Sequence, residues 1–237
     1  MAARDRLLLS CEHGGRRVPA AWRASFRGAG PVLDSHRGYD AGALSLARAL
    51  SRRLRAPLLA ATVTRLLVDL NRSEGHPRLF SELTRGLPSR ERQRILALQH
   101  RPHRGAVAGA VVRALDRGDR VVHVAVHSFT PVWAGTSRRT EVGLLYDPAR
   151  PGERRFATAW QRALREAAPG LTVHRNAPYR GTADGLTTAL RRRFAPGRYL
   201  GLELEVSQGL LVGRGARPQE MARLLADTLS RVAEARR

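Results

Sequence analysis

Residues 121–129 have the sequence Val-Val-His-Val-Ala-Val-His-Ser-Phe, in which two histidines interrupt an apolar run. A run this rich in valine is typical of a strand that is covered on both faces of a parallel sheet. Because side chains alternate along a strand, His123 and His127 are expected on the same side. Similar runs lie before and after it, and we predict strands over residues 6–10, 57–62, 66–70, 121–127, 142–146, 171–174 and 199–206.

Helical patterns separate these runs, with apolar residues spaced three or four apart. We predict helices over residues 41–55, 89–115 with a kink or break near Pro102, 153–168 and 218–235. This alternation predicts an α/β fold with a largely parallel central sheet flanked by helices. The sequence contains no internal repeat and no low-complexity linker, so we expect one domain over residues 1–237.

The charge of the chain is its most unusual compositional feature. The 237 residues include 42 basic and 20 acidic side chains, which gives a formal net charge of +22. All the basic residues are arginines, and they are spread from Arg4 to Arg237. Proteins that bind phosphate usually gather their basic residues on one face or tail. The charge is therefore better explained by a bias of the source genome, and it favours nucleic acid as a partner only weakly.

Cysteine content and hydropathy bear on the cellular compartment. The single cysteine, Cys11, excludes an intramolecular disulfide, which fits a reducing environment. The apolar run at residues 7–9 is too short for a signal peptide, and no stretch approaches the 18 or so apolar residues of a membrane span. We therefore expect a cytoplasmic protein that does not cross a membrane.

Polar residues follow four of the predicted strands, where ligands bind in open α/β sheets. These four segments are residues 10–15, 69–73, 127–129 and 203–208. His127 ends its strand where it can reach the space of His13, whereas His123 is better explained as a buried histidine bonded to a carbonyl group. Glu203 and Glu205 alternate in an apolar strand, and burying them requires either pairing with arginines or a role beside a metal. An Asn71-Arg72 pair is suited to binding a carboxylate.

Taken together, these segments resemble the N-formylglutamate amidohydrolase family, which is distantly similar to zinc carboxypeptidases and aspartoacylases. The matching residues run through nearly the whole chain: 10–15, 34–42, 69–73, 100–103, 127–129, 176–181 and 203–208. The resemblance implies a zinc-exopeptidase-like fold with a mixed, mostly parallel sheet. It also implies a hydrolase that holds Zn²⁺ or another divalent transition metal.

The resemblance implies that His13 and His127 are two metal ligands. The H-x-x-E spacing of carboxypeptidases fails here, because Arg16 stands three residues after His13. Asp40 is our choice for the third ligand, and Glu12 and His36 are its rivals. If the helix after residue 40 begins early, His36 and Asp40 share a face, and one could ligate while the other supports it.

The remaining roles also follow from the resemblance. Glu205 corresponds to the general base, and Glu203 either orients it or pairs with an arginine. Asn71 and Arg72 are assigned to substrate carboxylates, whereas Arg180 is either a second clamp or an ordinary surface arginine. Four residues complete the expected site as supporting groups, with His100 and His103 lining or bracing it: Glu203, His100, His103 and Ser128.

The implied substrate is a small N-acyl amino acid, with N-formyl-L-glutamate cleaved to formate and L-glutamate as the leading reaction. A different acylated amino acid or a peptide C-terminus is the alternative, and histidine degradation is the pathway that the leading reaction implies. Since Arg72 follows a predicted strand, its loss should weaken substrate binding. Loss of charge in the run 191–193 should affect little beyond solubility. No oligomeric state follows from the sequence.

Overall fold

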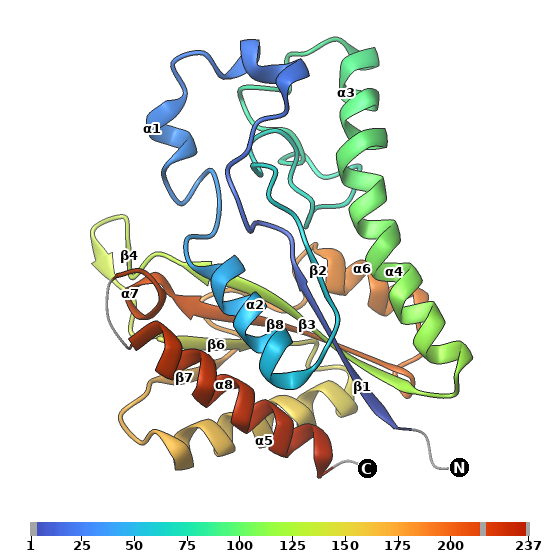
Figure 1. Ribbon diagram of the computed structural model, residues 1–237, viewed down its shortest axis with the longest axis vertical. Coiled ribbons are helices and arrows are strands. Elements are labelled where there is room, and N and C mark those ends of the chain that lie inside the picture. Colours follow the sequence, from blue (N-terminus) through green and yellow to red (C-terminus); the bar gives the residue numbers. More distant parts are fainter. Residues whose placement is uncertain (1–3, 214–216, 236–237) are drawn as a thin grey trace.

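A six-stranded sheet forms the centre of the computed structural model, which describes residues 4–213 and 217–235 (Figure 1). Its strand order is β2-β1-β3-β8-β6-β7. The bounds are β1 (Asp5–Cys11), β2 (Leu58–Ala60), β3 (Arg120–Phe129), β6 (Val142–Leu145), β7 (Val173–Arg175) and β8 (Tyr199–Ser207). All neighbouring pairs are parallel except β6 and β8, which are antiparallel. The expected α/β fold with a mixed, mostly parallel sheet is confirmed.

Helices cover both faces of the sheet, and each face buries its own apolar cluster. Helices α2 (Ala43–Leu54), α5 (Pro151–Ala167) and α8 (Arg217–Glu234) pack on one face. Helices α4 (Arg101–Asp116) and α6 (Leu186–Arg193) pack on the other. None of the described helices is long and apolar enough to cross a membrane.

Alternation along the central strands decides which face receives the polar residues. Val122, Val124 and Val126 of β3 and the leucines of β8 enter the cluster beneath α2, α5 and α8. The intervening residues of both strands therefore point to the α4 and α6 face. These intervening residues include His123, His127, Glu203 and Glu205.

The predicted strand at residues 66–70 is wrong, because this segment forms turns outside the sheet. Its amides bond locally, with Leu67 N–H donating to the carbonyl of Thr64 and Asp69 N–H to that of Leu79. The apolar side chains of the segment are nevertheless buried, in a second cluster above the sheet with Trp22, Phe26 and Ile95. An apolar run indicates that a segment is buried, but it does not show that the segment is a strand. Here the segment is buried within a lobe of loops and short helices (Figure 1).

The long predicted helix at residues 89–115 continues through the proline. Helix α3 (Ser89–Ile95) passes into a π-helical turn, η2 (Leu96–His100), and then into α4, which has Pro102 in its first turn. Because the chain is helical on both sides of Pro102, the proline removes one donor to the preceding turn, and the helix is locally widened to π geometry just before it. The helix is therefore altered near Pro102, as expected, but it does not end there.

Smaller elements were not predicted, because their apolar patterns are too short. They are the 3₁₀ helix η1 (Ala20–Phe26), α1 (Gly30–Leu33), α6, α7 (Gln208–Leu211), and a hairpin of β4 (Val132–Trp133) and β5 (Thr136–Ser137).

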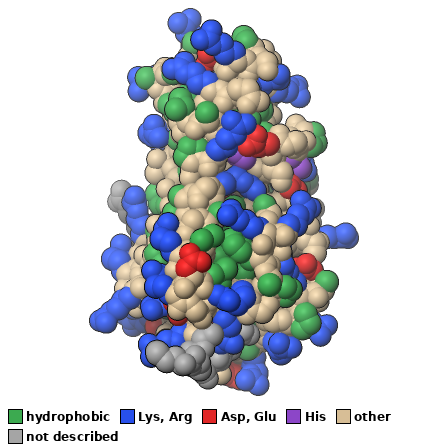
Figure 2. All heavy atoms as spheres, turned by 90° about the vertical axis from the view of Figure 1, so that its right-hand side faces the viewer, with side chains coloured by type: hydrophobic (Ala, Val, Ile, Leu, Met, Phe, Trp, Pro, Cys, Tyr) green, Lys and Arg blue, Asp and Glu red, His purple; other side chains and the backbone are tan. Residues whose placement is uncertain are grey.

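Arg191 in α6 contradicts the expectation that the run 191–193 serves only solubility. Its side chain is buried and pairs with the buried Glu153 at 3.0 Å. It also donates to the carbonyl oxygens of Gly181 and Gly201. Arg192 and Arg193 are exposed, as expected. Other arginines are scattered over the face in Figure 2 and do not gather into one basic patch there.

Candidate metal centre and its pocket

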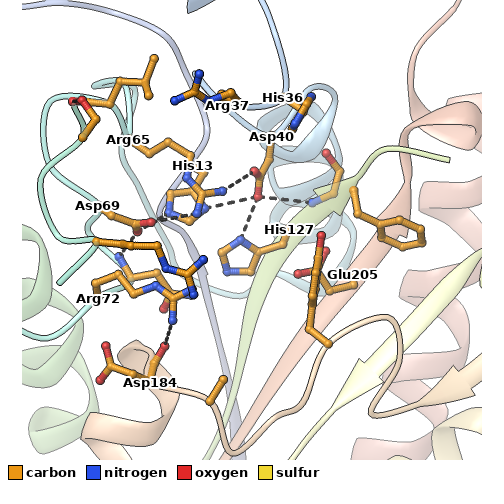
Figure 3. Close-up of a pocket in the computed structure, with 18 of the residues that line it drawn as sticks. His13, His36, Arg37, Asp40, Arg65, Asp69, Arg72, His127, Asp184 and Glu205 are labelled. Carbon is orange, nitrogen blue, oxygen red and sulfur yellow. Dashed lines mark hydrogen bonds and ion pairs between the residues drawn. The ribbon is translucent and has the colours of Figure 1, made fainter. Parts of the chain in front are cut away.

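Three buried side chains meet at the carboxyl ends of β1 and β3: His13, Asp40 and His127. Nδ1 of His127 lies 2.9 Å from Oδ2 of Asp40, and Nδ1 of His13 lies 3.4 Å from the same oxygen. The potential ligand atoms of the three residues all lie within 4.8 Å of one another. Figure 3 shows both imidazole rings turned toward the Asp40 carboxylate. Among the described residues, this is the group of His, Cys, Asp or Glu side chains with a geometry that could hold a metal ion.

The far nitrogen of each histidine faces a second buried carboxylate. Nε2 of His13 lies 2.7 Å from Oδ1 of Asp69, and Nε2 of His127 lies 3.1 Å from Oε2 of Glu12. Contacts of this kind fix the tautomer and orientation of a metal-binding histidine, so that its other nitrogen can offer a lone pair. Glu12 therefore lies behind His127 and outside the three-residue group. Asp69 was not predicted to have this role, although it precedes the expected Asn71-Arg72 pair.

Asp40 is held by backbone and by charge. Its N–H donates to the carbonyl of His13, and its Oδ1 accepts from Arg65 at 3.3 Å. Helix α2 begins only at Ala43, so the expectation that His36 and Asp40 share a helical face is wrong. His36 lies in a turn, and Asp40 lies in the irregular segment that follows it. The ring of His36 packs edge-on against Trp133, with ring centroids 5.5 Å apart.

Burial disfavours the charged forms of the side chains in this centre, but the pairing of opposite charges has the larger effect on their pKa values. Burial alone would raise the pKa of Asp40 and of Asp69, but His13 and Arg65 hold both pKa values well below their usual range. Burial would lower the pKa of His127, but hydrogen bonding to Asp40 and Glu12 raises it well above the usual value. The carboxylates are thus ionised and are paired with the two histidines and Arg65, and a metal ion would bind here in exchange for the protons of the histidines.

Glu205 lies beside this group, because its position on β8 is in register with His127 on β3. Its side chain is buried, and Oε2 has no hydrogen-bond partner. Burial, with a further contribution from Asp40 and Glu203, raises the pKa of Glu205 to about 8. A carboxyl group with a raised pKa is a stronger base than an exposed one, which suits proton transfer near neutral pH.

A pocket of about 810 Å³ opens over these residues. Its floor contains His13, Asp40, His127 and Glu205, and its walls come from the loop lobe and from the β4–β5 hairpin (Figure 3). Seven arginines line it: Arg37, Arg65, Arg72, Arg78, Arg85, Arg138 and Arg180.

The predicted substrate-binding residues all line this pocket, but they are held differently. Arg72 donates to the backbone carbonyl of Asp184 at 2.6 Å, and the Asn71 side-chain carbonyl accepts from the N–H of Leu186 at 2.7 Å. Arg180 is exposed, and no hydrogen bond or ion pair holds its side chain within the described part of the chain.

The contacts of the two supporting histidines, and of the buried His123, are explained by the structure. His100 braces Arg72, because its Nε2 lies 2.8 Å from the Arg72 carbonyl oxygen. Nε2 of His103 lies 3.5 Å from Oε1 of Glu12, behind the centre. His123 is buried as expected, but it is bonded to the hydroxyls of Ser10 and Tyr199 and not to a carbonyl group. Burial lowers the pKa of His123 to about 4.

The two remaining supporting residues are also placed. Glu203 accepts a hydrogen bond from Thr187 at 2.6 Å, and it forms no ion pair with an arginine among residues 4–213 and 217–235. The Ser128 hydroxyl donates to the carbonyl of Ala41, next to Asp40, at 2.7 Å. Both therefore fix neighbouring parts of the floor.

Two arginines of the pocket escaped the sequence analysis because nothing distinguishes them among 42. Arg65 pairs with both Asp40 and Asp69, at 3.3 and 2.8 Å. Arg138 stands over three aromatic rings at the pocket wall.

The fold and the site define an α/β protein with a buried His-Asp-His group at the carboxyl ends of its strands. A model of the N-formylglutamate amidohydrolase family matches residues 5–212. The chain belongs to this family of hydrolases that act on linear amides.

Solved structures support the fold. The gene product Atu2144 from Agrobacterium tumefaciens is 30% identical, with 98% of this chain and 92% of that chain covered and a TM-score of 0.84. N-formylglutamate amidohydrolase from Ralstonia eutropha JMP134 is 22% identical, with 99% and 94% covered and a TM-score of 0.73. A metallo-carboxypeptidase from Burkholderia cenocepacia is a weaker match, at 15% identity, 98% and 57% covered and a TM-score of 0.41. No curated protein matches the sequence.

Proposed function

We propose that this protein is a metal-dependent amidohydrolase of N-acyl amino acids, and that N-formyl-L-glutamate is its substrate. The products are formate and L-glutamate. The observation that carries the proposal is the His13, Asp40 and His127 group with the buried Glu205 in register beside it. Because these residues come from segments far apart in the sequence, we propose that residues 1–237 act as one catalytic domain.

The three residues suit Zn²⁺ or a similar divalent ion. Two imidazole nitrogens and one carboxylate oxygen are a common donor set for catalytic zinc, which keeps a fourth position for water. The buried Nδ1 of His13 has no hydrogen-bond partner, so an acceptor of its lone pair is missing from the described residues. A bound Zn²⁺ supplies a Lewis acid and lowers the pKa of water from about 15.7 to about 7.

Glu205 then acts first as a general base and afterwards as a general acid. It accepts a proton from the attacking water, whose oxygen forms the new bond to the formyl carbon. As the C–N bond breaks, Glu205 returns this proton to the departing nitrogen, which leaves as the amine of glutamate. Glu12 and Asp69 keep the histidines oriented during these steps, and Arg65 keeps Asp40 and Asp69 in place.

The arginines of the pocket suit an acidic substrate. Arg72 is braced by Asp184 and His100 and can offer its remaining donors to a carboxylate. We assign the α-carboxylate of the substrate to Asn71 and Arg72. They lie two and three residues after Asp69, which contacts His13 of the metal centre.

Two measurements on purified protein test the proposal. Metal analysis should find about one divalent ion per chain, and this ion should be lost in His127→Ala. The kcat/KM for N-formyl-L-glutamate should exceed that for N-acetyl and N-succinyl amino acids and for peptides. A protein without metal whose activity survives chelation would overturn the metal chemistry. Higher kcat/KM for one of the other substrates would overturn the choice of substrate.

A further inference from the structure

We propose that Arg138 selects the substrate by pairing with its side-chain carboxylate, in the same pocket that Arg72 lines. This inference rests on the proposed function, because it concerns which N-acyl amino acid enters the same site. Nothing in the sequence distinguishes Arg138 from the other arginines. Its surroundings in the fold do so.

Three aromatic rings hold the guanidinium group of Arg138. Its central carbon lies 5.3 Å from the ring centroid of Trp133, 5.3 Å from that of Tyr179 and 5.4 Å from that of Phe129. A cation within about 6 Å of an aromatic face is attracted by the ring quadrupole. Three such contacts fix one planar group, so a ligand meets an arginine that is already ordered.

The hydrogen bonds of Arg138 leave most of its donors free. One terminal nitrogen, Nη1, donates to the Tyr179 hydroxyl at 3.1 Å and to the Thr130 carbonyl at 3.4 Å. A guanidinium group has five N–H donors, and a carboxylate binds two of them side by side. The other terminal nitrogen and Nε therefore remain available for an anion.

Arg138 also forms no ion pair with a carboxylate among the described residues, which separates it from Arg37 and Arg65 but not from the other arginines of the pocket. Arg37 pairs with Glu82, and Arg65 pairs with Asp40 and Asp69. The positive charge of Arg138 is therefore not neutralised within the protein. A dicarboxylic substrate would bring the missing negative charge.

Arg180 is a poorer candidate for the same role. It is exposed and has no ring, acid or carbonyl to hold it within the described residues. Ordering such a flexible side chain on binding costs about 0.5–1.5 kcal/mol, and the aromatic contacts of Arg138 have already met this cost.

The position of Arg138 at the base of the β4–β5 hairpin fits a selecting role. Trp133 on this hairpin contacts both Arg138 and the ring of His36, so the hairpin packs against the segment that contains His36. Arg72 belongs to a different segment, the loop after Asp69, and is bonded to the Asp184 carbonyl. Two cations from separate segments thus line the same pocket, which suits a substrate with two carboxylates.

The test compares three substrates that differ by one charge. N-formyl-L-glutamine lacks the side-chain charge, and N-formyl-L-isoglutamine lacks the α-charge. Arg138→Gln should lower kcat/KM for N-formyl-L-glutamate by about 10- to 100-fold. It should leave kcat/KM for N-formyl-L-glutamine nearly unchanged. Arg72→Gln should instead remove the preference for glutamate over isoglutamine.

Arg139→Gln is the matched control, because Arg139 is the exposed neighbour and does not line the pocket. It should keep wild-type selectivity. An equal loss for all three substrates in Arg138→Gln, or a retained preference for glutamate over glutamine, would overturn the proposal. Arg138→Lys should restore only part of the preference, because lysine cannot bind a carboxylate through two fixed donors.

A separate readout distinguishes failure of this proposal from failure of the proposed function. If the wild-type protein hydrolyses none of the three compounds, the proposed function fails. Calorimetric binding of N-formyl-L-glutamate and N-formyl-L-glutamine then tests Arg138 directly. Loss of the difference in Kd on Arg138→Gln supports the selecting role, and an unchanged difference overturns it.

Discussion

His127 and Glu205 lie in register on the neighbouring parallel strands β3 and β8. Paired residues of adjacent strands point to the same face of a sheet, so the backbone ladder itself brings the candidate ligand and the candidate base together. Their relative position does not depend on a loop. The same face also carries His123, four residues before His127, and Glu203, two residues before Glu205.

Replacing Glu205 with glutamine should lower kcat by about 10²- to 10⁴-fold, because the variant keeps the shape of the side chain but cannot accept a proton. Metal content should stay at the wild-type level, since Glu205 is outside the His13, Asp40 and His127 group. Steady-state kinetics with metal analysis check both points. Glu166→Gln, an exposed carboxylate on α5, is the control. Activity retained within a few-fold in Glu205→Gln would exclude Glu205 as the base.

Asp69→Asn should weaken metal binding by about 10- to 100-fold through the orientation of His13. Asp69 contacts Nε2 of His13 at 2.7 Å and is itself bonded to Arg65. Competition with a chelator of known affinity measures the change. Asp34→Asn, at an exposed ion pair with Arg16, should bind metal like the wild type. Equal affinities for the two variants would show that Asp69 does not act through His13.

Arg191→Gln should destabilise the fold by about 3–5 kcal/mol, because it leaves Glu153 as a buried charge without its partner. Arg192→Gln, at the exposed next position, should change the free energy of unfolding by at most about 0.5 kcal/mol. Urea denaturation of the two variants provides the comparison. Similar midpoints would contradict the structural role of the buried pair.

His123 makes a contribution to stability that is lost on mild acidification, opposite in sign to the contributions of His127 and Glu205, whose pKa values are raised. Its pKa is lowered by burial to about 4, whereas an unfolded histidine titrates near 6.5. Between these values His123 binds more protons in the unfolded chain than in the folded one, so its contribution to stability falls as the pH drops below 6.5.

The His123 contribution is about 2 kcal/mol between pH 7.5 and pH 5.0. The change in unfolding free energy from pH 7.5 to pH 5.0 should therefore be more favourable in His123→Gln than in the wild type by about this amount. His76→Gln removes a histidine outside the pocket and the core, and its unfolding free energy should change with pH as that of the wild type does. Identical pH dependence in all three proteins would contradict this account.

Continuous apolar runs predicted the sheet well, because six of the seven became strands in a sheet covered on both faces. The run 66–70 failed for a physical reason, since side-chain hydropathy reports burial and carries no information about the partner of each backbone amide. Asp69, Asn71 and Arg72 nevertheless line the pocket, although no strand precedes them.

The sequence located the centre more securely than its environment. His13, His127 and Asp40 were predicted and do meet, and both rivals for the third position lie outside the group. Charge partners were harder to predict. Arg65, Arg138 and Arg191 have distinct contacts, yet in the sequence they are three of 42 arginines.

The pairing of β3 with β8 bears on how new substrate specificities could evolve in this family. Amides along 121–129 and 199–207 lie in the middle of the sheet and should be among the slowest in the chain to exchange with solvent deuterium. The β4–β5 hairpin is a separate two-stranded unit with an exposed tryptophan, and it should exchange early. Insertions or substitutions in that hairpin can reshape what the enzyme admits, while the reacting groups stay anchored in the most rigid part of the chain.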